Sequence, residues 1–195
     1  MKPTGLYYFK DIISENEEKE IINYLNRENE WFNVVPNTKS REVIHYGYEY
    51  PYRFDKNSKM NKIKDIPEIF NNVLKKIYNM PELKTLFENY KFDQLIINKY
   101  EPGQGIAPHV DHIKFFDKII ACFTIGSGLN IKFNRVSDGK EYDIYVEPRS
   151  FYIMSENARY NWTHGINKQI TDVYSNKVIP RETRISLTFR KVNNP

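Results

Sequence analysis

Hydrophobic residues recur along this chain with two different periods, and the period changes before residue 92. Over 14–29 they follow helical spacing, and Ser14 opens the stretch with the signature of a capping box. A second helical pattern covers 67–80 and begins with a proline, which is tolerated at the first helical position. Between them, 41–54 is rich in aromatic and β-branched residues. The first part of the chain therefore predicts two helices with a strand or hairpin between them.

Short strand patterns fill the rest of the chain and are separated by turns rich in Gly, Pro, Asn and Asp. Two helices followed by six or more short strands indicate an α+β, mainly β fold, in which a sandwich or barrel carries helices packed on one side. No repeat, linker or low-complexity segment divides the chain, so 1–195 is expected to be a single domain. The predicted strands are 92–100, 118–126, 129–133, 141–147, 150–155 and 184–192.

Composition narrows the functional classes. Of 195 residues, 40% are hydrophobic, 15% are aromatic and 28% are charged, which is typical of a folded globular domain. No stretch approaches the roughly 18 to 20 apolar residues of a membrane span, so no membrane partner and an intracellular, cytoplasmic location are expected. Cys122 is the single cysteine, which excludes an internal disulfide and any multi-cysteine zinc site. The net charge of +4 permits an anionic partner without requiring one.

Two of the four histidines stand close together and bracket an aspartate. If this segment is extended, His109 and Asp111 reach the same side, although His112 could equally replace His109. His164 lies far along the chain, where another strand could bring it back. Two imidazoles and a carboxylate on one side of a metal form the triad of non-haem iron(II) oxygenases, which leaves positions open for substrate and dioxygen. The alternative is a chance H-x-D whose histidine is a surface or capping residue.

Alternation along two strands supports this chemistry. Gln94, Ile96, Asn98 and Tyr100 share one strand face, and so do Arg184, Ser186, Thr188 and Arg190 on the last strand. A buried arginine is costly without a partner, so arginines that face inward would imply an anionic ligand inside the fold. In the opposite arrangement the aliphatic face of the last strand points inward and both arginines lie in solvent.

The combination of H-x-D at 109–111, His164 and R-x5-R at 184–190 resembles the AlkB family of iron(II) and 2-oxoglutarate dioxygenases. The stretches HYGYEY, YEPGQGI, RYNWTHGI and TFRKV are similar to the branch whose animal member joins an AlkB domain to a tRNA methyltransferase. The resemblance implies a double-stranded β-helix (jelly-roll) core over about 91–195. It also implies N-terminal helices and a nucleotide-recognition flap over about 1–90.

The resemblance further implies which residues hold the cofactors Fe(II), 2-oxoglutarate and O2. The catalytic metal ligands would be His109, Asp111 and His164. Arg184 would pair with the distal carboxylate of 2-oxoglutarate. The remaining contacts that orient this cosubstrate would come from Asn98, Tyr100 and Arg190.

The branch resemblance favours tRNA as the nucleic-acid substrate, with hydroxylation of 5-methoxycarbonylmethyluridine at the wobble position. The chain would act as a monomer, and a separate tRNA methyltransferase would make the ester. Oxidative N-demethylation of alkylated DNA or RNA bases is an alternative that uses the same ligands. A non-catalytic jelly-roll binding module and a protein-oxidising relative are further alternatives.

Candidate substrate contacts lie mainly in the predicted flap, whose aromatic and basic side chains suit stacking of a flipped base and contact with phosphates. Packing within the hairpin is the alternative for the tyrosines, and a surface salt bridge is the alternative for Arg159. The candidates are Arg41, His45, Tyr46, Tyr48, Tyr52, Arg53, His112 and Arg159.

Overall fold

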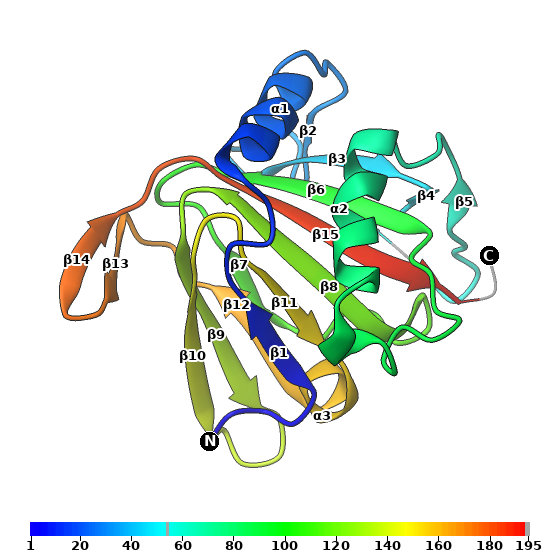
Figure 1. Cartoon of the computed structure of the whole chain (residues 1–195). Helices are drawn as coiled ribbons and strands as arrows, with labels where there is room; N and C mark the ends of the chain where they lie inside the picture. The colour runs from blue at the N-terminus through cyan, green and yellow to red at the C-terminus, as the bar shows by residue number, and fades with distance from the viewer. Residues whose placement is uncertain (54, 194–195) are drawn as a thin grey trace.

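Two antiparallel β-sheets pack against each other and form the body of the protein (Figure 1). The computed structural model describes residues 1–53 and 55–193. The larger sheet contains, in spatial order, β1 (Leu6–Phe9), β11 (Phe151–Met154), β8 (Phe116–Gly126), β15 (Arg184–Val192), β6 (Gln94–Tyr100), β3 (Glu42–Tyr46) and β2 (Phe32–Asn33). The smaller sheet contains β10 (Glu141–Val146), β9 (Leu129–Arg135), β12 (Trp162–Ile166) and β7 (Ile106–His109). This arrangement confirms the predicted jelly-roll core.

Two short strand pairs lie outside these sheets. One is β13 (Thr171–Tyr174) with β14 (Lys177–Pro180), which projects from the body at the left of Figure 1. The other is β4 (Tyr48–Glu49) with β5 (Asn61–Lys62), which falls within the predicted flap. Gly47 begins this flap with a φ of +77°, and a Cβ there would lie 1.9 Å from a backbone oxygen of Asp93. Only glycine fits that turn without displacing the neighbouring strand.

Both predicted helices are present and cover the outer face of the larger sheet (Figure 1). Helix α1 (Glu15–Leu25) begins with the predicted capping box, in which the Ser14 hydroxyl accepts from the backbone N–H of Glu17. Helix α2 (Glu68–Tyr78) follows, and both helices end a few residues before the predicted limits. The remaining helical elements are η1 (Pro81–Leu83) and α3 (Glu156–Tyr160).

Strand β15 is buried on both faces, which explains why its sequence left the orientation open. Its aliphatic residues Ile185, Leu187 and Phe189 join the core cluster that packs against α1 and α2. Its polar face therefore points into the space between the two sheets, where Arg184 and Arg190 remain less than a tenth exposed. Because α1 and α2 cover the aliphatic face of β15, the arginines on its other face point inward.

The N-terminal third does more than supply helices and a flap, because it also contributes strands to the larger sheet. Strand β1 pairs with β11, and β3 pairs with β6 from Glu42 to Tyr46. Strands β1, β7, β12, β13 and β14 were not among the predicted strand patterns. Each is only four or five residues long, so alternation within it is a weak signal in a single sequence.

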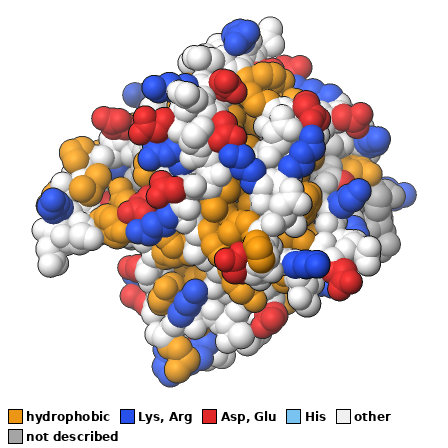
Figure 2. Space-filling model, in the orientation of Figure 1, with side chains coloured by type: hydrophobic (Ala, Val, Ile, Leu, Met, Phe, Trp, Pro, Cys, Tyr) orange, Lys and Arg blue, Asp and Glu red, His pale blue; other side chains and the backbone are white. Residues whose placement is uncertain are grey.

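Charged side chains of both signs are interspersed on the face seen in Figure 2, so this face has no continuous region of one charge. Exposed aliphatic side chains occur on and beside the projecting hairpin, at Ile170, Val173 and Val178. None of the helices in the described part of the chain combines the length and apolar character needed to cross a bilayer.

Candidate active site

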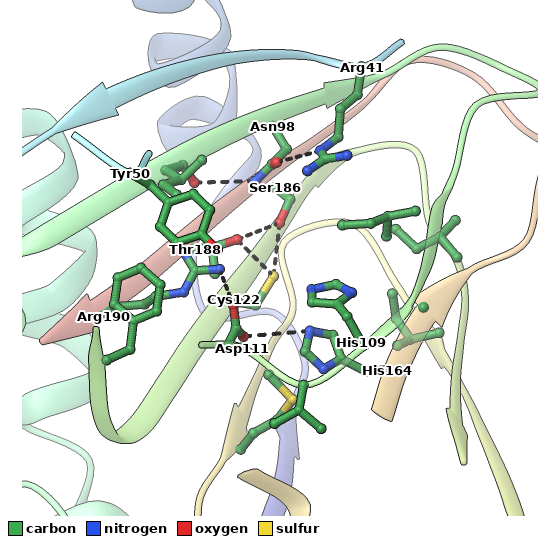
Figure 3. Close-up of a pocket in the computed structure, with 18 of the residues that line it drawn as sticks. Arg41, Tyr50, Asn98, His109, Asp111, Cys122, His164, Ser186, Thr188 and Arg190 are labelled. Atoms are coloured by element: carbon green, nitrogen blue, oxygen red, sulfur yellow. Dashed lines mark hydrogen bonds and ion pairs between the residues drawn. The ribbon is translucent and has the colours of Figure 1, made fainter. Parts of the chain in front are cut away.

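A pocket of about 320 Å³ opens between the two sheets and contains the predicted triad. The polar face of β15 forms one wall, and β7 with β12 forms the opposite wall (Figure 3). The predicted residues that line it are Arg41, Tyr52, Asn98, Tyr100, His109, Asp111, His112, His164, Arg184 and Arg190.

The triad is assembled by strand register. Strands β7 and β12 are antiparallel neighbours in which His109 and His164 stand directly opposite each other, with ring centroids 4.4 Å apart. Asp111 follows β7 by two residues, and its Oδ2 lies 3.7 Å from Nε2 of His164. One potential ligand atom from each residue lies within 4.8 Å of the other two. The group that can hold a metal therefore contains His109, and His112 remains a neighbour.

Hydrogen bonding prepares His109 for metal binding. Its Nδ1 lies 2.9 Å from the backbone oxygen of Ala107, which can only accept, so Nδ1 carries the proton and Nε2 keeps its lone pair. Burial and the nearby His109 lower the pKa of His164 to about 3. The His164 imidazole is therefore neutral near pH 7, which is the form that binds metals.

Asp111 is held as a carboxylate by its neighbours. Burial alone would raise its pKa, but Arg190, His164 and His109 together hold that pKa well below its usual range. Its Oδ1 accepts from Nη2 of Arg190 at 2.8 Å, whereas its Oδ2 is buried without a hydrogen-bond partner among the described residues. An oxygen in this position is costly unless it binds a cation, so the carboxylate fits a metal ligand.

Arg184 is a buried cation with no acidic partner in the described part of the chain. Its side chain is only 2% exposed, its Nη2 donates to Oγ1 of Thr124 at 2.9 Å, and its Nε has no hydrogen-bond partner there. On Arg190, Nε and Nη1 are likewise buried without partners. Two guanidinium groups with unused donors, in the same pocket as the triad, fit a small dianion such as 2-oxoglutarate.

Further polar contacts line the wall between the arginines (Figure 3). Arg41, the residue before β3, donates from Nε to Oδ1 of Asn98 at 3.0 Å and so contacts the predicted cosubstrate residue on β6. The thiol of Cys122 lies 2.9 Å from the hydroxyl of Ser186, which in turn lies 3.1 Å from that of Thr188. These contacts connect the side chains of neighbouring strands along this wall.

The remaining flap candidates lie outside the pocket lining. His45 is buried behind Tyr52, and Tyr46 is buried in the core cluster beneath the helices. Tyr48 packs against a small cluster that contains Met60 and Phe115. Arg53 is exposed, and Phe54, at the end of the predicted hairpin segment, lies outside the described residues.

Several pocket residues were not singled out from the sequence, namely Tyr50, Phe116, Cys122 and Tyr152. Tyr50 stacks on Phe116 with ring centroids 5.5 Å apart. Alternation could have indicated two of them, because Tyr50 is two residues from Tyr52 and Cys122 is two residues from the polar Thr124 on the same strand. Phe116 and Tyr152 had no such signal, because they reach the pocket only through sheet packing.

Arg159 is 2% exposed and supports the loop that carries Asp111. From α3 it donates to three backbone oxygens, those of Asp111 at 2.9 Å, Phe116 at 3.0 Å and Asp117 at 3.1 Å. It does not line the pocket. The guanidinium group is therefore placed to hold the metal-binding loop against the body of the protein.

Replacing Arg159 by methionine is expected to lower the free energy of unfolding by about 3 kcal/mol, because buried carbonyl groups lose a charged donor. Fe(II) affinity should also fall, by roughly 10- to 100-fold, as for other groups that position metal ligands. Urea unfolding and metal titration measure the two effects. The matched control is Arg135→Met, which removes a surface arginine that pairs with Asp138. A loss below about 1 kcal/mol would contradict the supporting role.

Protonation of His45 should lower the free energy of unfolding at acidic pH. Burial and, as a smaller contribution, the charge of Arg190 together lower its pKa to about 4. A histidine with a depressed pKa in the folded state stabilises the fold above its unfolded pKa of about 6.5. That contribution is lost as the pH falls from about 6.5 toward 4.

Urea unfolding of the wild type and of His45→Gln at pH 7.5 and at pH 4.5 tests this effect. Between these two values the wild type should lose about 2 kcal/mol more than the variant, because glutamine does not titrate. Equal losses in the two proteins would show that His45 does not contribute to the acid response.

Comparison with known proteins agrees with this geometry. A family model described as the 2OG-Fe(II) oxygenase superfamily matches residues 5–190. Uncharacterized protein L905 of Acanthamoeba polyphaga mimivirus is 35% identical over 191 residues, which cover 96% of this chain and 85% of that protein. The solved structure of OsALKBH1 is similar with a TM-score of 0.70 at 16% identity, and the match covers 98% of this chain and 99% of that one.

A longer relative is the tRNA (carboxymethyluridine(34)-5-O)-methyltransferase ALKBH8 of Mus musculus, which is 33% identical over 210 residues. The match covers 97% of this chain and 31% of the mouse protein. The chain thus spans about a third of the length of this relative.

Proposed function

This chain belongs to the 2OG-Fe(II) oxygenase superfamily, and we propose that it hydroxylates 5-methoxycarbonylmethyluridine at the wobble position of tRNA. It is an AlkB-family dioxygenase that uses Fe(II), 2-oxoglutarate and O2. The observation that carries the oxygenase chemistry is the pair of buried arginines with unused donors beside the triad. The choice of a tRNA substrate rests on the flap and on the similarity to the mouse relative, whose name states that it methylates a carboxymethyluridine at position 34.

When bound together, Fe(II), 2-oxoglutarate and O2 supply the oxidation that inserts one oxygen atom into a substrate C–H bond, while 2-oxoglutarate leaves as succinate and carbon dioxide. His109, Asp111 and His164 would hold the metal from one side. Arg184 would pair with the distal carboxylate of 2-oxoglutarate, and Arg190 would contact its metal-bound end. The residues of this chain thus bind and orient the reactants.

The flap supports a nucleic-acid substrate. Tyr50 and Tyr52 place aromatic rings along the pocket, and Arg41 adds a positive charge beside them. A base inside a helical stack is out of reach of such a pocket and must be extruded. Stacking on aromatic side chains is worth about 1 to 3 kcal/mol per base, which offsets much of the cost of extruding one nucleotide.

The proposed substrate also implies another enzyme. The ester must be made by methyl transfer to a carboxymethyluridine, so we propose a separate tRNA methyltransferase that acts before this protein. Hydroxylation of the carbon that carries the ester then gives a stable alcohol. By contrast, oxidation of an N-methyl group would release formaldehyde.

Mass spectrometry of nucleosides tests the proposal directly. A tRNA that carries the ester-modified uridine is incubated with the protein, Fe(II), 2-oxoglutarate and air, beside Asp111→Ala and the surface control Asp143→Ala. A gain of one oxygen with the wild type and the surface control, absent with Asp111→Ala, is expected.

Two results would replace the proposed substrate. Loss of methyl groups with formaldehyde release from a panel of alkylated DNA and RNA would make the protein a demethylase. Absence of Fe(II)-dependent succinate with every nucleic acid would point to protein oxidation or to a binding module without catalysis.

A further inference from the structure

His45 is a buried histidine that the metal site does not use. It lies on β3 with 5% of its surface exposed, and its Nε2 is 3.1 Å from the hydroxyl oxygen of Tyr52. Its Nδ1 lies 3.4 Å from the backbone nitrogen of Tyr50. The ring of Phe32 packs edge-on against the imidazole at 5.3 Å. His45 thus connects the larger sheet to the two tyrosines that the flap contributes to the pocket.

The partners of His45 determine where its proton lies. The backbone N–H of Tyr50 can only donate, so Nδ1 must present its lone pair. Burial holds the imidazole in its neutral form near pH 7, which leaves one proton, and that proton must be on Nε2. The Nε2–H group then donates to the Tyr52 oxygen at 3.1 Å.

This arrangement gives the Tyr52 hydroxyl a defined polarity. Its oxygen accepts from His45, so its own proton remains available, and His45 is its only hydrogen-bond partner within the described residues. Burial raises the pKa of Tyr52 to about 12, so the phenol keeps this proton at neutral pH. Tyr52 lines the pocket beside Arg41 and Asn98. The pocket therefore contains an oriented O–H donor on the flap side.

We propose that Tyr52 donates a hydrogen bond to a carbonyl oxygen of the substrate base, and that His45 is the positioning residue that directs this donor into the pocket. The proposal rests on the proposed function, because a uracil base and its ester offer carbonyl oxygens as their main acceptors. The cosubstrate carboxylates have Arg184 and Arg190 as partners, which leaves the Tyr52 donor for the base. The Tyr52–His45 pair thus selects for the base.

Steady-state kinetics with the ester-modified tRNA compare four single variants of the full chain and one double variant. Tyr52→Phe removes the donor. His45→Asn keeps an acceptor near the Nδ1 position but does not reach Tyr52, whereas His45→Gln places an amide N–H near the Nε2 position. Tyr142→Phe is the matched control, because it removes a hydroxyl from β10, outside the pocket lining.

Tyr52→Phe and His45→Asn should each raise the KM for tRNA roughly tenfold, because a buried acceptor on the substrate loses its partner. The change in kcat should be much smaller. His45→Gln should recover most of the loss, and the Tyr52→Phe/His45→Asn double variant should be no worse than Tyr52→Phe alone. A rise in the KM for 2-oxoglutarate instead, or equal defects in His45→Gln and His45→Asn, would overturn the proposal.

The protonation pattern is tested without reference to turnover. Long-range proton–nitrogen NMR of protein labelled at histidine, with Zn(II) in place of Fe(II) and with 2-oxoglutarate present, should show His45 protonated at Nε2. A proton on Nδ1 would overturn the proposal. If the wild type leaves the uridine unchanged, the proposed function fails. Binding of the same tRNA to the same variants, measured by fluorescence anisotropy, then decides whether Tyr52 contacts the base.

Discussion

Replacing Asp111 by alanine is expected to abolish Fe(II)-dependent succinate formation and to lower metal affinity by more than about 100-fold. Asp111 is the only anionic member of the triad, and its Oδ2 is buried without a hydrogen-bond partner among the described residues. Removal of a group that only orients a metal ligand lowers metal affinity roughly 10- to 100-fold, so removal of a ligand itself should lower it further. Anaerobic titration with Fe(II) and a succinate assay measure the two effects.

The same substitution has a second consequence, which concerns stability. Arg190 donates to Asp111 at 2.8 Å and would be left as a buried cation without its carboxylate. Removal of one member of a buried ion pair costs about 3 to 5 kcal/mol, so the ligand-free variant should unfold at lower urea concentration. Asp143→Ala, an exposed aspartate on β10, should change neither quantity. Unaltered metal affinity in Asp111→Ala would rule out the assigned metal site.

Replacing Arg184 by methionine is expected to raise the dissociation constant for 2-oxoglutarate at least about 30-fold, because loss of a charged partner from a buried ligand pair costs about 2 to 5 kcal/mol. The Fe(II) affinity should be nearly unchanged, since Arg184 contacts no member of the triad. Titration of 2-oxoglutarate into the Fe(II) protein under anaerobic conditions gives this constant directly.

Arg184→Met should lower the affinity for 2-oxoglutarate without lowering the stability of the ligand-free protein. In the ligand-free protein the buried guanidinium has no acidic partner in the described part of the chain, so an apolar side chain of similar length removes a desolvation cost. We expect its free energy of unfolding to equal or exceed that of the wild type. Arg135→Met, at a surface ion pair, serves as the control. A destabilised variant that still bound 2-oxoglutarate normally would show that Arg184 has a structural role.

The elements that could be predicted from the sequence are those with enough residues to display a period. Both long helices show helical spacing, the strands that contain Ile131 and Leu187 show alternation, and the strand that contains Phe123 is a long apolar run; the structure confirms all of them. Strands such as β7 and β12 are too short to show a pattern, yet they carry His109 and His164. Pairing with neighbouring strands, a long-range contribution, stabilises them as strands.

Within the site, the sequence indicated the chemistry of the ligands but not their arrangement. The sequence left open whether His109 or His112 joins Asp111, and only the register between β7 and β12 places His109 opposite His164. The basic residue Arg159 suggested substrate contact, whereas its guanidinium group holds backbone oxygens beneath the loop that carries Asp111.

The sequence by itself determined which side chains share a strand face, because that follows from the two-residue period of a single extended chain. It thereby grouped Arg184 with Arg190 and Asn98 with Tyr100. The tertiary structure decided which face points into the pocket, because that depends on what covers the other face. Helices α1 and α2 bury the aliphatic face of β15. The arginines are left between the sheets, where only an anionic ligand can balance the unpaired charge of Arg184.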